Sequence, residues 1–217
     1  MSKIFMYGEK EIEYLKKVDP VLGKIIDEIG LIERKVTPDL FTSLVNSIVG
    51  QQISSKAMAT VWGRFQERFS PITPETLDEA SLDEIQQCGM SMRKATYIKE
   101  ATAKIVSGEL NIDELYTLSE EEVIKKLSAL HGIGVWTAEM IMIFCMQRPN
   151  IMSWGDLAII RGLRMLYRHR KIDKKLFQKY KRRYSPYASV ASLYLWEIAG
   201  GACNLKDLAP KVTKSKK

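Results

Sequence analysis

Two glycines separated by one residue, Gly132 and Gly134, lie where the chain could bind a phosphate. The stretch Leu130–Ala138 reads LHGIGVWTA; a helical pattern that begins near Ser119 runs into the first glycine, and a new one follows the second. Glycine permits positive φ and a close approach of the backbone. Such a turn directs backbone amides outward at the start of the second helix, where the helix dipole favours an anion. The residues alone also allow a tight corner between two helices that binds nothing.

A carboxylate follows this turn at Asp156, directly before the apolar run Leu157–Ile160. An aspartate in this position can cap the helix that the run predicts, because its side chain accepts hydrogen bonds from first-turn amides. An ionised carboxylate can also stabilise positive charge on a bound substrate. The two roles are compatible, so the residue type leaves both open.

Basic residues are concentrated in the last quarter of the chain. From Arg164 to Lys217 the net charge is +12, whereas residues 1–163 carry −5. Nine basic side chains and one acidic side chain lie between Arg168 and Arg183. Such a patch favours a polyanion, because each neutralised phosphate releases condensed counterions. The alternative is a solvated helix face followed by a lysine-rich tail of Lys211, Lys214, Lys216 and Lys217.

The composition is that of a globular protein. The chain has 217 residues, of which 46% are apolar and 27% charged, enough for one large domain or two small ones. The apolar run around Ile141–Met146 is far shorter than the ~20 residues of a membrane span, and residues 1–10 lack the apolar core of a signal peptide. Cys88, Cys145 and Cys203 are widely spaced and odd in number, which excludes a disulfide framework and a CxxC zinc site. We therefore expect a soluble intracellular protein.

Helical patterns occupy almost the whole chain, and alternating strand patterns with hairpin dipeptides are absent. Start and stop signals mark several helices: Thr37-Pro38-Asp39 as N-cap and first turn, the capping boxes Ser81–Glu84 and Ser119–Glu122, Ser185-Pro186, and Gly200-Gly201 as an end. After the first signal, apolar residues keep the spacing of one helix face at Phe41, Leu44, Val45, Ile48 and Val49. The pattern predicts an all-α protein.

Two short stretches, Lys35–Pro38 and Arg148–Asn150, are candidate domain boundaries. They predict a central helical domain over residues 38–148, which contains the glycine turn near its end. Residues 1–37 and 149–217 would then form a second helical lobe from both ends of the chain.

The glycine turn resembles the helix-hairpin-helix motif, and the chain around it resembles the HhH-GPD superfamily of DNA glycosylases, in its DNA-3-methyladenine glycosylase II branch. The other segments that carry the resemblance are Ile48–Ser54 (IVGQQIS), Gly89–Ala95 (GMSMRKA), Ser153–Ala158 (SWGDLA) and Ser185–Trp196 (SPYASVASLYLW). They follow the family order and cover most of residues 38–197. The resemblance implies a two-lobed helical fold with the active-site cleft between the lobes.

The resemblance also implies a monofunctional DNA glycosylase of base excision repair. Such an enzyme flips an alkylated purine of the 3-methyladenine type out of the duplex and hydrolyses its N-glycosidic bond, which leaves an abasic site. Trp136 stands where bifunctional relatives have a Schiff-base lysine, so no lyase activity is expected. A glycosylase for hypoxanthine, uracil or another lesion stays open. A non-catalytic DNA-binding module also stays open, although it would need neither Asp156 nor an aromatic residue at position 136.

Particular residues take roles by this resemblance. Asp156 is the expected catalytic carboxylate, which stabilises the oxocarbenium-like sugar and positions water. Aromatic rings suit a cationic base, and the expected base pocket consists of Trp136, Trp196 and Trp154, with core packing as the alternative for the first two. Gln52, with its neighbour Ile53, stands where the family has the wedge that fills the space of the flipped nucleotide; capping or buried hydrogen bonding is the alternative for Gln52.

The expected partner is double-stranded DNA that contains damaged bases. The hairpin residues expected to contact phosphates are Gly132, Gly134, Val135, Trp136 and Thr137, and the basic segment adds Arg182 and Arg183. No cofactor is expected to be required, although the carbonyls of Ser128, Leu130 and Ile133 could hold a Na⁺ or K⁺. Three cysteines cannot supply the four ligands of the iron–sulfur cluster that some relatives carry. We expect a monomer without membrane contact, in the cytoplasm with the nucleoid in a prokaryote, or in the nucleus of a eukaryote.

Overall fold

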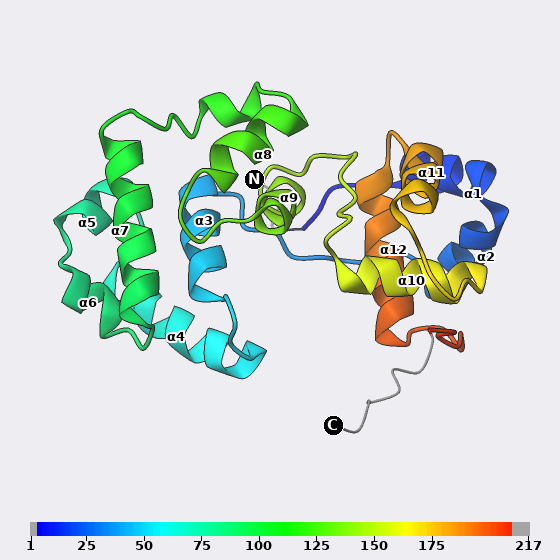
Figure 1. Cartoon of the computed structure of the whole chain (residues 1–217), viewed down its shortest axis with the longest axis horizontal. Coiled ribbons are helices and arrows are strands. Elements are labelled where there is room, and N and C mark those ends of the chain that lie inside the picture. Colours follow the sequence, from blue (N-terminus) through cyan, green and yellow to red (C-terminus); the bar gives the residue numbers. More distant parts are fainter. Residues whose placement is uncertain (1–3, 210–217) are drawn as a thin grey trace, which may run out of the picture. The chain divides into compact units, whose positions relative to one another are not determined.

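The computed structural model describes residues 4–209, and all of their regular elements are helical (Figure 1). β-pairing within this range is limited to one isolated antiparallel bridge, between Ile4 and Lys35. The prediction of an all-α protein is therefore confirmed. In chain order the elements are α1 (Glu9–Val18), α2 (Pro20–Ile29), α3 (Leu40–Val49), α4 (Ser55–Arg68), α5 (Pro74–Glu79), α6 (Leu82–Gln86), α7 (Met92–Val106), the 3₁₀ helix η1 (Glu114–Tyr116), α8 (Glu120–Ser128), α9 (Val135–Phe144), α10 (Leu157–Tyr167), α11 (Lys174–Tyr184) and α12 (Ala188–Gly200).

Contacts divide the described chain into two compact units. The first contains Val36–Met146, and the second contains Ile4–Lys35 together with the chain from Gln147 onward. Both ends of the described chain therefore belong to the second unit. Of the lysine-rich tail, Lys211, Lys214, Lys216 and Lys217 lie outside the described residues.

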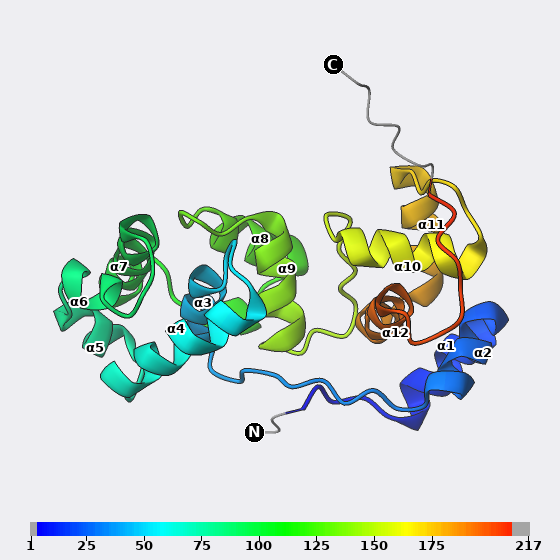
Figure 2. The same ribbon diagram turned by 90° about the horizontal axis from the view of Figure 1, so that it is seen from below.

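Helix α3 is the centre of the first unit and lies between α7 and α9 (Figures 1 and 2). Its apolar face is buried as the spacing predicts. Its start differs from the prediction: Asp39 is the N-cap and accepts a 2.7 Å hydrogen bond from the Thr42 amide, so neither Thr37 nor Pro38 caps the helix. The reason is that the Asp39 carboxylate satisfies the Thr42 amide of the first turn, whereas the Thr37 amide donates to the Phe144 carbonyl at the end of α9.

The two predicted capping boxes are confirmed, and one of them starts the helix that leads into the glycine turn. Ser119 accepts from the Glu122 amide at 3.3 Å, and the Glu122 carboxylate accepts from the Ser119 amide at 3.0 Å. Ser81 and Glu84 make the same pair of bonds at α6. Helix α8 therefore begins at a defined residue, which fixes where the chain enters the turn.

Helix α12 forms the core of the second unit and is buried on nearly all sides. It begins at Ala188, after the predicted start at Ser185-Pro186, and ends at Gly201 in the left-handed conformation, as predicted. Helix α10 packs along it so closely that a Cβ on Gly162 would lie 2.3 Å from the Leu195 carbonyl oxygen. Only glycine allows this contact between the two backbones.

Candidate active site

The glycine turn between α8 and α9 depends on two different properties of glycine. Gly132 has φ +83°, and a Cβ there would lie 2.5 Å from Cδ2 of the Tyr97 ring, so this position is restricted by both conformation and space. Gly134 has ordinary φ and is the N-cap of α9, with no atom within 4 Å of its Cβ position. The first glycine therefore allows the turn to pack on Tyr97, and the second leaves the start of α9 open to a ligand.

The first turn of α9 is exposed in the way that a phosphate site requires. The N-cap is a glycine, so no side chain at that position competes for the first-turn amides. Val135 and Trp136 at this end are 53% and 48% exposed. A helix N-terminus with this exposure suits an anion.

A cavity of about 570 Å³ lies beside this turn in the first unit. Its wall contains Gln52 and Trp136, so the predicted wedge residue and one predicted base-pocket residue line the same space. Its other lining residues are Asn46, Ser47, Gly50, Gln51, Met58, Gly132, Thr137 and Met140. The half-exposed ring of Trp136 belongs to this cavity wall, which disfavours the alternative that Trp136 is a core residue.

Gln52 lies in the segment between α3 and α4, with φ +55° and an exposed side chain. Its exposure disfavours buried hydrogen bonding. Capping of α4 is done by Ser54, whose hydroxyl accepts from the Ala57 amide at 3.2 Å. Ile53 is 37% exposed and, with Gln52, also lines a second cavity of about 270 Å³.

Asp156 is the N-cap of α10 in the second unit and is almost fully buried. Its Oδ1 accepts from the amides of Ala158 at 2.8 Å and Ile159 at 3.0 Å, so the predicted capping role is confirmed. Two bonds to one oxygen fix the orientation of the carboxylate. The residue that follows Asp156 in the sequence, Leu157, has an apolar side chain that is 84% exposed to solvent.

The other two predicted pocket tryptophans also belong to the second unit. Trp154 lies two residues before Asp156, is partly exposed, and packs edge-on against Phe177 with ring centroids 5.2 Å apart. Trp196 is partly buried on α12, next to the residue whose carbonyl contacts Gly162 of α10.

Arg182 and Arg183 have different environments, which their adjacency in sequence does not predict. Arg182 is exposed on α11. The Arg183 guanidinium donates to Asp19 at 2.7 Å, stacks over Tyr180, and has its pKa raised mainly by that hydrogen bond to Asp19. Asp19 is buried and also accepts from the Tyr167 hydroxyl. This arrangement commits Arg183 to an internal ion pair.

The three carbonyls predicted to hold a cation belong to the end of α8 and the glycine turn. The Leu130 carbonyl accepts a 3.1 Å hydrogen bond from the Ile133 amide and keeps a second lone pair. Neutral oxygen donors of this kind suit Na⁺ or K⁺. Among residues 4–209, no group of three or more His, Cys, Asp or Glu side chains could hold a metal ion.

Three residues that support the turn and the α3–α4 segment were not predicted to contribute. The Gln51 side-chain amide donates to the Gly132 carbonyl, Lys94 donates to two carbonyls around Gly50, and Tyr97 packs under Gly132. The only sequence signal was that Gln51 and Lys94 fall in segments that resemble the family; their partners are distant in sequence.

Comparisons with known proteins identify the family of the chain. The family model described as "HhH-GPD superfamily base excision DNA repair protein" matches residues 45–186. The chain belongs to this superfamily. DNA-3-methyladenine glycosylase 1 of Schizosaccharomyces pombe is 33% identical over 178 residues, which cover 79% of this chain and 77% of that protein.

Two solved structures extend the similarity over most of the chain. A DNA-3-methyladenine glycosidase from Bacillus halodurans matches with TM-score 0.83 and 36% identity, covering 93% of this chain and 94% of that one. The Schizosaccharomyces pombe 3-methyladenine DNA glycosylase Mag1, in complex with abasic DNA, matches with TM-score 0.73 and 29% identity over 87% and 96% of the two chains. The predicted family, with its 3-methyladenine branch, is confirmed. None of the described helices has the length and apolarity to cross a bilayer.

Proposed function

We propose that this protein is a monofunctional DNA glycosylase that removes alkylated purines of the 3-methyladenine type from duplex DNA and leaves an abasic site. The observation that carries the proposal is the 36% identity, over nearly the whole of both chains, to a structure named as a DNA-3-methyladenine glycosidase. The relative that is bound to abasic DNA supports DNA as the partner. A DNA repair enzyme acts where the genome is, and we propose that this one acts as a monomer.

Asp156 supplies the charge that this reaction needs. Cleavage of the N-glycosidic bond develops positive charge on the sugar, as in other oxocarbenium-like glycosyl transfers. The two amide bonds to Oδ1 hold the carboxylate in place before substrate arrives, so little reorganisation is needed when the charge forms. The same carboxylate positions the water that attacks the sugar.

The base pocket needs no strong general acid for this substrate class. An alkylated purine is already cationic, so it leaves readily as a neutral base. The Trp136 ring beside the 570 Å³ cavity stacks on such a base and attracts its charge, and Trp154 and Trp196 are the further pocket residues that we propose. The indole of Trp136 has no amine that could form a Schiff base with the sugar. We therefore expect that the DNA strand is not cleaved after base release.

DNA is held by several groups of residues. The amides of the α9 start, from Gly132 to Thr137, bind phosphates near the lesion, and Gln52 with Ile53 enters the space of the flipped nucleotide. Arg182 adds a phosphate contact, whereas Arg183 acts mainly within the protein. A Na⁺ or K⁺ bound by the carbonyls of Ser128, Leu130 and Ile133 would add positive charge at the turn.

The decisive experiment is release of methylated bases from alkylated duplex DNA by the wild type and by Asp156→Asn. Asparagine still caps α10 and keeps the volume, so we expect loss of release by at least about a hundred-fold with DNA affinity retained. Strand breaks without added alkali test the lyase prediction, and we expect none. If the wild type binds DNA tightly but releases no methylated base, the same assay with hypoxanthine- and uracil-containing duplexes separates another lesion from a non-catalytic binding module.

A further inference from the structure

The backbone of Gln52 adopts a conformation that the chain must enforce. Its φ of +55° is in the left-handed region, which residues other than glycine adopt only when surrounding contacts hold them there. Gln52 has an exposed side chain and is not in a helix, so packing of its own side chain does not provide that hold.

The ammonium group of Lys94, on α7, constrains the backbone on the N-terminal side of Gln52. Its Nζ donates to the Val49 carbonyl at 2.8 Å and to the Gln51 carbonyl at 2.6 Å. Val49 is the last residue of α3, where the helix dipole favours a cation. The Gln51 carbonyl belongs to the peptide group that leads into Gln52, so its orientation directly constrains φ of Gln52.

The partly buried position of Lys94 disfavours the charged form of its side chain. Burial, with a smaller effect of Arg93, lowers the pKa of Lys94. Both hydrogen bonds given above end on backbone carbonyls, so the charged group is used to fix main chain.

Helix α7 supports the glycine turn with the same face. Tyr97 follows Lys94 by three residues, so the two side chains lie on one side of the helix, and the Tyr97 ring packs under Gly132. The Gln51 side-chain amide donates to the Gly132 carbonyl and so connects the segment between α3 and α4 directly to the glycine turn. The turn and the segment of Gln52 therefore share one support.

We propose that Lys94 is a positioning residue for base flipping: its ammonium holds the Val49 and Gln51 carbonyls so that Gln52 stays in the conformation that fills the space of the flipped nucleotide. This inference rests on the proposed function, in particular on Gln52 as the wedge. It adds a residue that acts on duplex opening without touching the reacting atoms.

The chain contains a matched control on the same helix. The Lys99 ammonium also bridges two consecutive carbonyls, those of Leu77 at 3.0 Å and Asp78 at 2.6 Å near the end of α5, away from Gln52. Lys94→Met and Lys99→Met each remove one ammonium and two carbonyl bonds from α7. A purely structural role predicts the same behaviour for both variants.

The first readout is insertion into DNA, which needs no catalysis. The probe is a duplex with an abasic-site analogue beside 2-aminopurine, whose fluorescence rises when a wedge unstacks it. At saturating protein, we expect Lys99→Met to give the same increase in 2-aminopurine fluorescence as the wild type. We expect Lys94→Met to lose most of this increase. A rise in Lys94→Met equal to that of Lys99→Met would overturn the inference.

The second readout is single-turnover base release from duplex and from single-stranded alkylated DNA, at a temperature where all variants are folded. We expect Lys94→Met to slow release from duplex by about ten-fold or more, since small displacements of positioning groups have effects of this size, and to change single-strand release little. Equal slowing on both substrates would count against the inference. If Lys94→Met does not fold, Lys94→Gln serves with the same criteria, because it is shorter but keeps a hydrogen-bond donor.

The two readouts separate failure of this inference from failure of the proposed function. Absence of base release by the wild type contradicts the proposed function, whereas the fluorescence comparison still decides the role of Lys94. Release by the wild type with indistinguishable lysine variants contradicts only the role of Lys94.

Discussion

Arg182 and Arg183 show how the partner of a side chain decides what it can do. Both are basic residues of α11, and the sequence gives them the same expected role. Arg183, however, is paired with the buried carboxylate of Asp19, which also caps α2 and accepts from Tyr167. Burial raises the pKa of Tyr167, so its phenol remains a neutral donor to that carboxylate. Arg183 therefore stabilises the fold, whereas Arg182 is the residue of the pair that is exposed to solvent.

We predict that Arg183→Met lowers the free energy of unfolding by about 2–3 kcal/mol, because it leaves the Asp19 carboxylate buried without its cationic partner. Methionine preserves much of the side-chain volume, so the loss reports the charge. Urea unfolding measures it, and Arg182→Met is the control, with an expected change within about 0.5 kcal/mol. Equal changes in the two variants would contradict the assignment.

At the scale of elements, the contact between α10 and α12 supports the candidate active site. Helix α10 begins at Asp156, and α12 carries Trp196 beside the Leu195 carbonyl that approaches Gly162. A Cβ added at Gly162 must push one backbone away from the other, because the three nearest atoms all belong to the Leu195 backbone and not to a flexible side chain.

Gly162→Ala should therefore destabilise the protein by about 1–3 kcal/mol, although alanine favours helix, and should also slow base release. Gly63→Ala is the matched control within α4, because no atom outside the backbone of its own helix lies within 4 Å of its Cβ position, and it should stabilise by up to about 1 kcal/mol. Thermal unfolding of both variants tests the pair. Shifts of Tm in the same direction would show that the contact with Leu195 does not limit this position.

An ion pair between Arg164 and Asp207, which depends on pH, connects α10 to the segment that follows α12. Arg164 donates to both carboxylate oxygens of Asp207, at 2.9 and 2.6 Å, and this hydrogen bonding lowers the pKa of Asp207. A carboxyl group with a lowered pKa stabilises the folded state above its unfolded-state pKa and loses that effect as pH falls through its folded-state pKa.

Asp207→Asn should thus cost about 1 kcal/mol of unfolding free energy at neutral pH, and the difference from wild type should disappear in acid below the folded-state pKa of Asp207. Chemical denaturation at a series of pH values measures the difference. A difference that stays constant down to the lowest pH would assign the effect to packing instead of charge.

At the scale of the whole molecule, sequence patterns predicted what short-range interactions determine. The capping boxes and the cap at Asp156 depend on residues within four positions of one another, the apolar face of α3 repeats at spacings of one to four positions, and each is present. The start of α3 was predicted two residues too early, because Thr37, Pro38 and Asp39 are all residue types that suit a helix start and only Asp39 makes the cap bond, to the Thr42 amide. The Asp19–Arg183 pair and the support of Gln52 by Lys94 span long separations. No local pattern contains that information, so local partners such as the amides that Asp156 caps were predictable, whereas partners distant in sequence were not.

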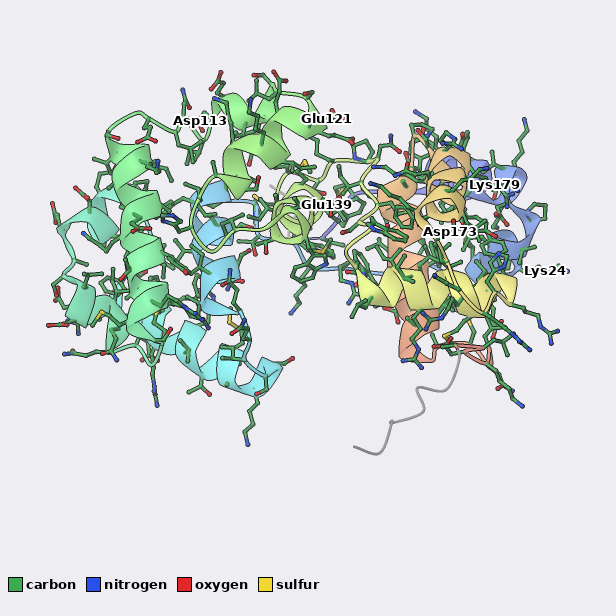
Figure 3. All side chains as sticks on the ribbon, viewed as in Figure 1. Lys24, Asp113, Glu121, Glu139, Asp173 and Lys179 are labelled. Carbon is green, nitrogen blue, oxygen red and sulfur yellow. The ribbon has the colours of Figure 1, made fainter. Side chains whose placement is uncertain are left out.

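The distribution of charge over the molecule leads to a last prediction. Figure 3 shows Lys179 and Asp173 with α11 and Lys24 with α2 in the second unit, whereas Asp113, Glu121 and Glu139 are acidic side chains of the first. If the basic α11 face binds phosphates, removal of one contacting charge reduces the slope of log affinity against log salt by about 0.9, independent of DNA sequence.

We expect Arg182→Ala to reduce this slope by about one such contact, to weaken binding equally for damaged and undamaged duplex, and to leave base release at saturating protein unchanged. Lys24→Ala removes the same unit of charge from α2 and serves as the control for net charge, with a smaller change of slope. Fluorescence anisotropy over a range of NaCl concentrations measures both. Because long-range attraction depends on total charge and a phosphate contact depends on position, identical slopes for the two variants would mean that α11 contributes only through net charge.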